Sequence, residues 1–148
     1  MNIGLVVNNL GNSEQSYEVI QLANKISETS NSLVPSIFFQ NIMPNILEPS
    51  CLCMNITGIS NFKGKVVAFG LDSANVVVNN NTNTENWLVL WDIPWLHTVI
   101  NYPVCIEILK KFKIIVRSQS HKDIVENYTG RNDIQIFEDI NELIKCLT

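Results

Sequence analysis

The sequence contains 148 residues, of which 46% are hydrophobic and 16% are charged, and this excludes an intrinsically disordered chain. One globular domain with a buried core is expected at that length. The chain has ten Lys and Arg residues and fourteen Asp and Glu residues. Its only cluster of basic residues comprises Lys110, Lys111 and Lys113. The resulting formal charge of −4 predicts that nucleic acid is not a partner.

Signals for export and membrane insertion are missing from the sequence. The first ten residues lack a basic segment and a cleavage site, and no apolar run approaches the roughly 18 to 20 residues that span a bilayer. We therefore expect a cytoplasmic protein with no membrane partner. The four cysteines are Cys51, Cys53, Cys105 and Cys146. They are too sparse for a disulfide scaffold and lack the spacing of zinc ligands, so we expect buried, reduced thiols. We expect neither a metal ion nor a cofactor.

The first element along the chain is a predicted strand over residues 3–7, an apolar run typical of a strand covered on both faces. A polar turn follows it. Asn12 or Ser13 can then cap a helix, with Gln15 in the capping-box position relative to Asn12. The apolar residues of this helix recur on one face, at Val19, Leu22, Ala23 and Ile26.

Strands and helices alternate along the rest of the chain. Cap residues and Pro103 predict four further helices, which begin at Asp72 or Ser73, at Pro103, at Ser120 and at Asp139. Residues 79–86, NNNTNTEN, contain no apolar member and predict an exposed connection. Apolar runs predict the remaining strands over residues 34–40, 52–54, 65–69, 87–93, 113–116 and 134–137.

This alternation predicts a single α/β domain over residues 1–148, a three-layer Rossmann-like or flavodoxin-like fold with a mainly parallel sheet. Helices should cover both faces of the sheet. In such folds ligands bind at the carboxyl ends of the strands, where the strand order reverses. Function is therefore expected in the loops that follow Val7, Phe69, Leu90 and Val116.

The loop after the first strand is the first candidate ligand site. It runs through Asn9, Gly11, Asn12 and Ser13 into the N-terminus of a helix, whose free N–H groups suit a phosphate or carboxylate. It has neither the spacing of a dinucleotide fingerprint nor the lysine of a P-loop. The alternative is a simple turn, in which Asn and Gly residues adopt left-handed backbone angles.

The second candidate site is the stretch from Trp91 to His97, where a strand leaves the sheet. Trp91 and Trp95 offer ring faces on which a sugar or base can stack, while Asp92 can accept hydrogen bonds from hydroxyl groups. His97 could serve as a general base. The alternative is that both indoles pack beneath the next helix and that Asp92 caps a turn.

The third candidate site is Arg117 and Ser118, which follow a strand and precede a helix. A cation beside a helix N-terminus suits a phosphate group. A surface salt bridge and a helix cap explain the same two residues. No paired acid and base with the spacing of a known catalytic motif was found, so catalytic residues stay unassigned.

Two stretches of the chain, NIGLVVNNLGNSEQSYEVIQLANKI and FKIIVRSQSHKDIVENYTGRNDIQIF, resemble the first Rossmann-like domain of GT-B glycosyltransferases. The resemblance implies binding of a nucleotide, a sugar nucleotide or a glycan. In that family the donor sugar nucleotide is held largely by a second domain, so the resemblance implies binding without complete catalytic machinery. Any activity would be glycosyltransferase-like.

The chain also resembles small proteins of tailed marine cyanophages. The resemblance rests on the MNIG start with Asn-Asn-Leu, the Trp-Asp turn, the Arg-Ser strand end and the final Asn-Glu-Leu-Ile helix. It implies a location in the host cytoplasm or in the virion. The alternative function is therefore a non-catalytic structural or assembly protein, whose partners are phage structural proteins or further copies of itself.

Overall fold

The computed structural model describes residues 1–44, 47–81 and 85–148 and contains one sheet of seven strands, all parallel. The prediction of a mainly parallel α/β domain is confirmed. The strand order β3-β2-β1-β4-β5-β6-β7 is that of Rossmann folds rather than the 2-1-3-4-5 order of flavodoxins. The strands are β1 (Asn2–Leu10), β2 (Val34–Ile42), β3 (Leu52–Asn55), β4 (Lys65–Phe69), β5 (Asn86–Leu90), β6 (Lys113–Val116) and β7 (Gln135–Ile136).

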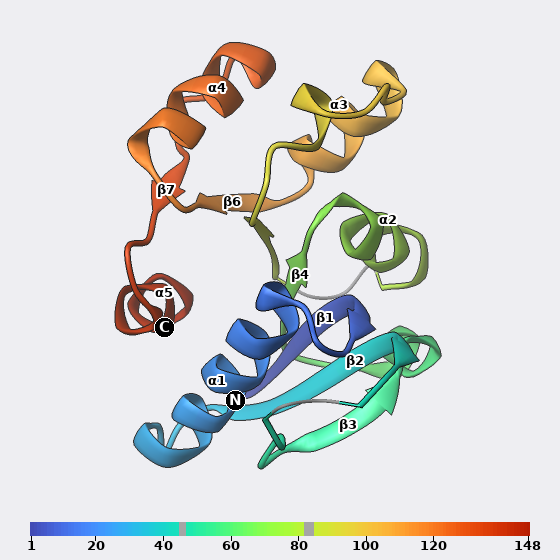
Figure 1. Cartoon of the computed structure of the whole chain (residues 1–148), viewed down its shortest axis with the longest axis vertical. Coiled ribbons are helices and arrows are strands. Elements are labelled where there is room, and N and C mark those ends of the chain that lie inside the picture. The colour runs from blue at the N-terminus through green and yellow to red at the C-terminus, as the bar shows by residue number, and fades with distance from the viewer. Residues whose placement is uncertain (45–46, 82–84) are drawn as a thin grey trace.

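Helices cover both faces of the sheet, which gives three layers (Figure 1). Helices α1 (Glu14–Thr29) and α5 (Ile140–Leu147) pack on one face. The short 3-10 helix η2 (Pro94–Leu96) follows β5. The opposite face carries α2 (Leu71–Asn80), α3 (Tyr102–Lys110), α4 (Gln119–Thr129) and the 3-10 helix η1 (Ile56–Asn61).

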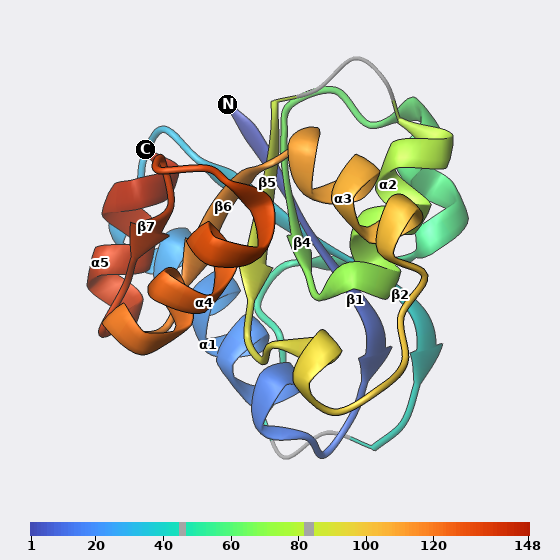
Figure 2. The ribbon, with the colours of Figure 1, turned by 90° about the horizontal axis from the view of Figure 1, so that it is seen from above.

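The interior strand β1 is buried on both faces, as its apolar run predicted. Ile3, Leu5 and Val7 face α1 and α5, whereas Val6 faces the opposite layer. Since all strands run the same way, their carboxyl ends meet at one edge of the sheet (Figure 2). No helix in the described ranges is both long enough and apolar enough to cross a membrane.

Several predicted boundaries are wrong by a few residues. Helix α4 is capped by Ser118, not by Ser120, because the Ser118 Oγ accepts a hydrogen bond from the His121 N–H at 3.2 Å. Strand β5 ends at Leu90 rather than residue 93, where its pairing with β6 stops. The cap of α5 at Asp139 is confirmed, since its Oδ1 accepts from the Glu142 N–H at 2.9 Å. Glu142 in turn accepts from the N–H of Glu138, the residue before the N-cap.

The prediction of an exposed connection over residues 79–86 is wrong at its ends, since residues 79 and 80 belong to α2 and Asn86 begins β5. It is also wrong at Asn81, while 82–84 lie outside the described residues. Helix α2 continues to Asn80, and Asn81 is only 3% exposed. Its Nδ2 donates to the carbonyl oxygens of Ile59 at 2.6 Å and Phe62 at 3.1 Å. A polar residue is buried here because it ties the end of α2 to the turn before β4.

Replacing Asn81 with alanine should lower the free energy of unfolding by about 2 kcal/mol, because the variant leaves two carbonyl groups without their donor. The neighbouring Asn80 is exposed and provides the control. Asn80→Ala should cost less than about 0.5 kcal/mol. Urea denaturation of both variants measures the difference, and equal losses would refute the buried role of Asn81.

The four cysteines are free, but the prediction that they are all buried is wrong. Only Cys105 is fully buried, whereas Cys51, Cys53 and Cys146 are half-buried at the margin of the core. Burial, together with the neighbouring Cys53 thiol, raises the pKa of Cys51 to about 11. Near neutral pH this thiol is protonated and therefore a poor nucleophile.

Candidate functional site

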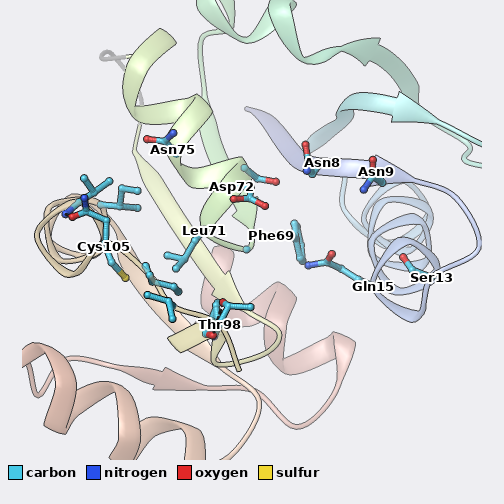
Figure 3. A pocket seen from close by; sticks show the side chains of 18 residues that line it. Asn8, Asn9, Ser13, Gln15, Phe69, Leu71, Asp72, Asn75, Thr98 and Cys105 are labelled. Carbon is cyan, nitrogen blue, oxygen red and sulfur yellow. Dashed lines mark hydrogen bonds between the residues drawn. The ribbon is translucent and has the colours of Figure 1, made fainter. Parts of the chain in front are cut away.

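A cavity lies at the carboxyl edge of the sheet, where the strand order reverses between β1 and β4. Its volume is about 640 Å³. Parallel α/β folds bind ligands at this switch point, because the loops on either side diverge to opposite faces. The lining residues come from the end of β1 and the start of α1, from the end of β4 and the first half of α2, and from η2, α3 and the segment between them. They are drawn in Figure 3: Asn8, Asn9, Ser13, Gln15, Phe69, Gly70, Leu71, Asp72, Ser73, Asn75, Pro94, Thr98, Val99, Ile100, Asn101, Val104, Cys105 and Ile108.

Three helices begin at this cavity. Their N-cap residues, Ser13 of α1, Gly70 of α2 and Asn101 of α3, all line it. The first turn of a helix carries unpaired N–H groups and the positive end of the helix dipole. The cavity therefore gathers three sources of partial positive charge, although no Lys, Arg or His is among its lining residues.

The start of α1 is held by two serines. The Ser13 Oγ accepts from the Ser16 N–H at 3.1 Å, which places the first helical turn at Glu14. Ser16 is buried, and its Oγ donates to the Asn9 carbonyl oxygen at 3.0 Å and accepts from the Gly11 N–H at 3.1 Å. The Ser16 hydroxyl thus fixes the loop that presents Asn9 and Ser13 to the cavity.

This loop needs no left-handed residue, contrary to the simple-turn alternative. Among the described residues, positive φ angles occur only at Gly64, Gly70 and Gly130. An added Cβ at Gly11 would lie 3.1 Å from the Cβ of Met43, an exposed residue that follows β2. Gly11 therefore lies at a close approach of two loops rather than at an unusual backbone angle.

The start of α2 forms the opposite wall. Gly70 has φ +92 and no side chain caps the helix that follows it. The Gln15 side chain extends across from α1 toward Phe69 and Leu71 (Figure 3), and its Nε2 would lie 3.9 Å from a Cβ at Gly70. Asp72 is exposed in the first turn of α2 and is the one carboxylic side chain among the lining residues.

Two buried polar groups, Ser73 and Cys105, also line the cavity. Ser73 is 1% exposed, and its hydroxyl has no hydrogen-bond partner within the described structure. Burial raises the pKa of the Cys105 thiol, so this cysteine is neutral and unreactive near neutral pH. The side of the cavity formed by Val99, Ile100 and Val104 is apolar.

The predicted site residues do not converge on one place. Asn9 and Ser13 line the cavity, whereas Gly11 is buried in the turn and Asn12 is exposed beside it. The Asn9 Oδ1 accepts from Asn41 at 3.0 Å, so this side chain also joins the ends of β1 and β2.

Trp91 and Arg117 form a separate pair. The guanidinium carbon of Arg117 lies 4.2 Å from the centre of the Trp91 ring, which in turn packs on Phe137. Nη2 of Arg117 lies 3.5 Å from Glu14 Oε1, an exposed ion pair at the first turn of α1. Neither Trp91 nor Arg117 lines the cavity; Asp92 is exposed outside it and Ser118 caps α4.

Trp95 and His97 line a second, shallower hollow of about 540 Å³ beside the cavity. The Trp95 ring stacks on Tyr128 of α4, with 4.1 Å between centroids and 12° between planes. One face of this indole is therefore occupied, but by α4 rather than by the next helix, α3, as the packing alternative predicted. Tyr102 meets the other side of Tyr128 edge-on at 5.2 Å.

Gln15, Gly70, Asp72 and Asn101 were not predicted as site residues. The loop after Phe69 was expected to matter, but the sequence does not show that it adjoins the loop after β1. The available signal was a predicted strand followed directly by Gly70, with the acidic Asp72 two residues further on. Within the described part of the chain, no three His, Cys, Asp or Glu side chains group so as to hold a metal ion.

Comparison of this chain with protein-family models, with curated proteins and with solved structures found no match. The resemblances to GT-B glycosyltransferases and to cyanophage proteins are not tested by this result and stay predictions. The function must therefore be argued from the geometry of the cavity.

Proposed function

We propose that this protein binds a nucleotide or sugar nucleotide in the cavity between β1 and β4. The observation that carries the proposal is the convergence of three helix N-termini, marked by Ser13, Gly70 and Asn101, on one cavity. Phosphate groups are favoured at helix N-termini because several N–H groups and the helix dipole act on them together.

The remaining lining residues fit the other parts of such a ligand. The Asp72 carboxylate accepts hydrogen bonds from ribose or sugar hydroxyls, and the amides of Asn8, Gln15 and Asn75 both donate and accept. The apolar wall around Val104 suits a base, because small-molecule sites combine apolar walls with a few polar groups.

The lining favours binding over catalysis. Its titratable side chains are Asp72 and Cys105, and the second is a neutral, buried thiol. A general acid and a general base both need side chains within reach of the reacting atoms. We therefore propose a binding domain, in agreement with the partial machinery that the GT-B resemblance implies.

A thermal-shift titration with uridine and guanosine diphosphate sugars tests the proposal. At ten times its dissociation constant a ligand stabilises the folded state by about 1.4 kcal/mol, which raises Tm by roughly 3–5 °C. Asp72→Ala should weaken binding at least tenfold, because the hydroxyl groups lose their acceptor.

Asp92→Ala is the matched control, since Asp92 is also exposed at this edge of the sheet but lies outside the cavity. It should leave the Tm rise unchanged. If Asp92→Ala abolished the rise while Asp72→Ala preserved it, the ligand would sit in the Trp91 to His97 stretch. Absence of any rise at millimolar nucleotide would remove the proposal.

A second candidate function is a non-catalytic role in assembly. It is favoured by large apolar side chains that are exposed together, at Leu96, Val99, Tyr102 and Val104. Exposed apolar patches commonly mark protein contacts. Mass spectrometry of purified phage particles tests this role, and absence of the protein from the particles would exclude a place in the virion.

A further inference from the structure

The three helices that begin at the cavity do not contribute equally to its lining. Four successive residues at the start of α2, from Gly70 to Ser73, line the cavity. The start of α1 contributes Ser13 and Gln15, whereas Tyr102, the first residue of α3, does not line it. Helix α2 is thus the one of the three whose whole first turn borders the cavity.

The backbone N–H groups of this turn are also the least used. In α1 the N-cap Ser13 accepts one such group, and in α3 the N-cap Asn101 accepts another. Pro103, the second residue of α3, has no N–H to offer. No side chain caps α2, and no acceptor for the N–H groups of residues 71–73 is found in the described ranges.

Ser73 is the observation that points to a ligand at this turn. Its side chain lines the cavity and is 1% exposed, and its hydroxyl has no hydrogen-bond partner among the described residues. Because buried polar groups nearly always find a partner, an unpaired hydroxyl at the wall of a cavity indicates a group that binds there. The hydroxyl and the N–H groups of residues 71–73 are all donors, so the group that satisfies them together is an oxyanion.

The Gln15 side chain brings one more donor to the same place. It extends from α1 to the start of α2 (Figure 3), and its Nε2 would lie 3.9 Å from a Cβ at Gly70. Within the described part of the chain its amide makes no hydrogen bond. Moving this side chain to admit a ligand therefore breaks no hydrogen bond, and Nε2 can donate to an oxygen bound at α2.

We infer that the start of α2 is the phosphate subsite of the cavity, where one phosphate group accepts from the Ser73 hydroxyl and from the N–H groups of residues 71–73. The inference rests on the proposed nucleotide-binding function and assigns the phosphate to one of the three helices. All these donors are neutral, and no Lys, Arg or His lines the cavity. A second phosphate would add negative charge without a cation to receive it, so the ligand class is a nucleotide recognised through a single phosphate.

Isothermal titration calorimetry with uridine, UMP and UDP, and with the guanosine series in parallel, tests this subsite. The monophosphate should bind about tenfold or more tightly than the nucleoside, and the diphosphate should bind no more tightly than the monophosphate. Ser73→Ala should weaken monophosphate binding about tenfold or more and leave nucleoside binding unchanged, because only the phosphate loses a donor. The Tm of the unliganded variant should not fall, since the hydroxyl has no partner among the described residues.

Ser120→Ala is the matched control. Ser120 lies in the first turn of α4, which starts at the same edge of the sheet, but it is exposed and does not line the cavity. This variant should leave all the affinities unchanged. Amide resonances of the ¹⁵N-labelled chain locate the phosphate, because the monophosphate but not the nucleoside should shift those of residues 71–73. Shifts confined to the first turn of α1 or α3 would overturn the assignment to α2.

The outcomes separate this inference from the nucleotide proposal. Suppose that the wild-type chain binds nucleoside and monophosphate, but Ser73→Ala weakens neither or weakens both equally. The phosphate subsite would then be wrong, and the binding proposal would stand. A diphosphate that binds about tenfold more tightly than the monophosphate would contradict a single phosphate position. If no ligand of either series binds the wild-type chain at millimolar concentration, the nucleotide proposal fails and this inference fails with it.

Discussion

Gly64→Ala is expected to lower the free energy of unfolding by roughly 3–4 kcal/mol, the largest effect of any single substitution considered. Gly64 lies just before β4 with φ +150, a conformation that residues with a Cβ rarely adopt. An added Cβ would also press against the carbonyl oxygen of Asn2 and lie 2.9 Å from its carbonyl carbon. Because both atoms belong to the backbone of β1, relief requires β1 and β4 to separate.

Gly130→Ala separates the two causes. Gly130 ends α4 with φ +72, but nothing lies within 4 Å of an added Cβ. This variant should lose about 1 kcal/mol from backbone strain alone. Guanidinium denaturation of both variants measures the contrast. Equal losses would mean that the contact with Asn2 contributes nothing.

Arg131→Ala is expected to cost about 2–3 kcal/mol, because hydrogen bonds from a charged donor to enclosed carbonyls are among the stronger ones. The Arg131 Nη1 donates to the carbonyl oxygens of Leu109 at 2.6 Å and Phe112 at 2.8 Å, where α3 ends. Its other nitrogens bind both oxygens of Asp133. The side chain is only 20% exposed and joins the end of α3 to the loop before β7.

The second arginine of the chain is the control. Arg117 is 38% exposed, pairs with Glu14 at 3.5 Å and stacks on Trp91. Arg117→Ala should cost less than about 1 kcal/mol, since exposed ion pairs and stacked cations contribute little. A larger loss for Arg117→Ala than for Arg131→Ala in urea denaturation would contradict this assignment.

The Arg131 network also predicts a pH dependence. The hydrogen bond from Arg131 lowers the pKa of Asp133 below its ordinary value of 3.8. A lowered carboxyl pKa contributes stability above the ordinary value, and this contribution is lost as pH falls through the lowered value. Arg131→Ala should therefore remove part of the decline in stability below about pH 4.

Local patterns were sufficient for most elements of this fold. The apolar run over residues 3–7 marks a strand that is buried on both faces, and β1 is such a strand. Pro103 lies in the first turn of α3, and Asp139 caps α5 with Glu142, as predicted. These features depend on residues within one turn or one strand, so short stretches of sequence are enough to reveal them.

Contacts between distant residues explain the errors. Asn81 was predicted to be exposed because its neighbours are polar, yet its amide is buried against carbonyls about twenty positions earlier in the chain. Gly11 was predicted to bind a ligand or, as the alternative, to make a turn with a left-handed angle, but it lies against Met43, which follows β2. No local pattern encodes either partner.

The sequence by itself determined that strands and helices alternate, that the strands are parallel and that polar loops follow their carboxyl ends. Only the tertiary structure decided which loops meet. With β1 paired to β2 and β4, the Asn9 loop faces Asp72, while Arg117 stacks on Trp91 outside the cavity. The physical reason is that strand order depends on pairing between segments far apart in the chain. The hydrophobic pattern within one segment does not indicate which other segment it pairs with.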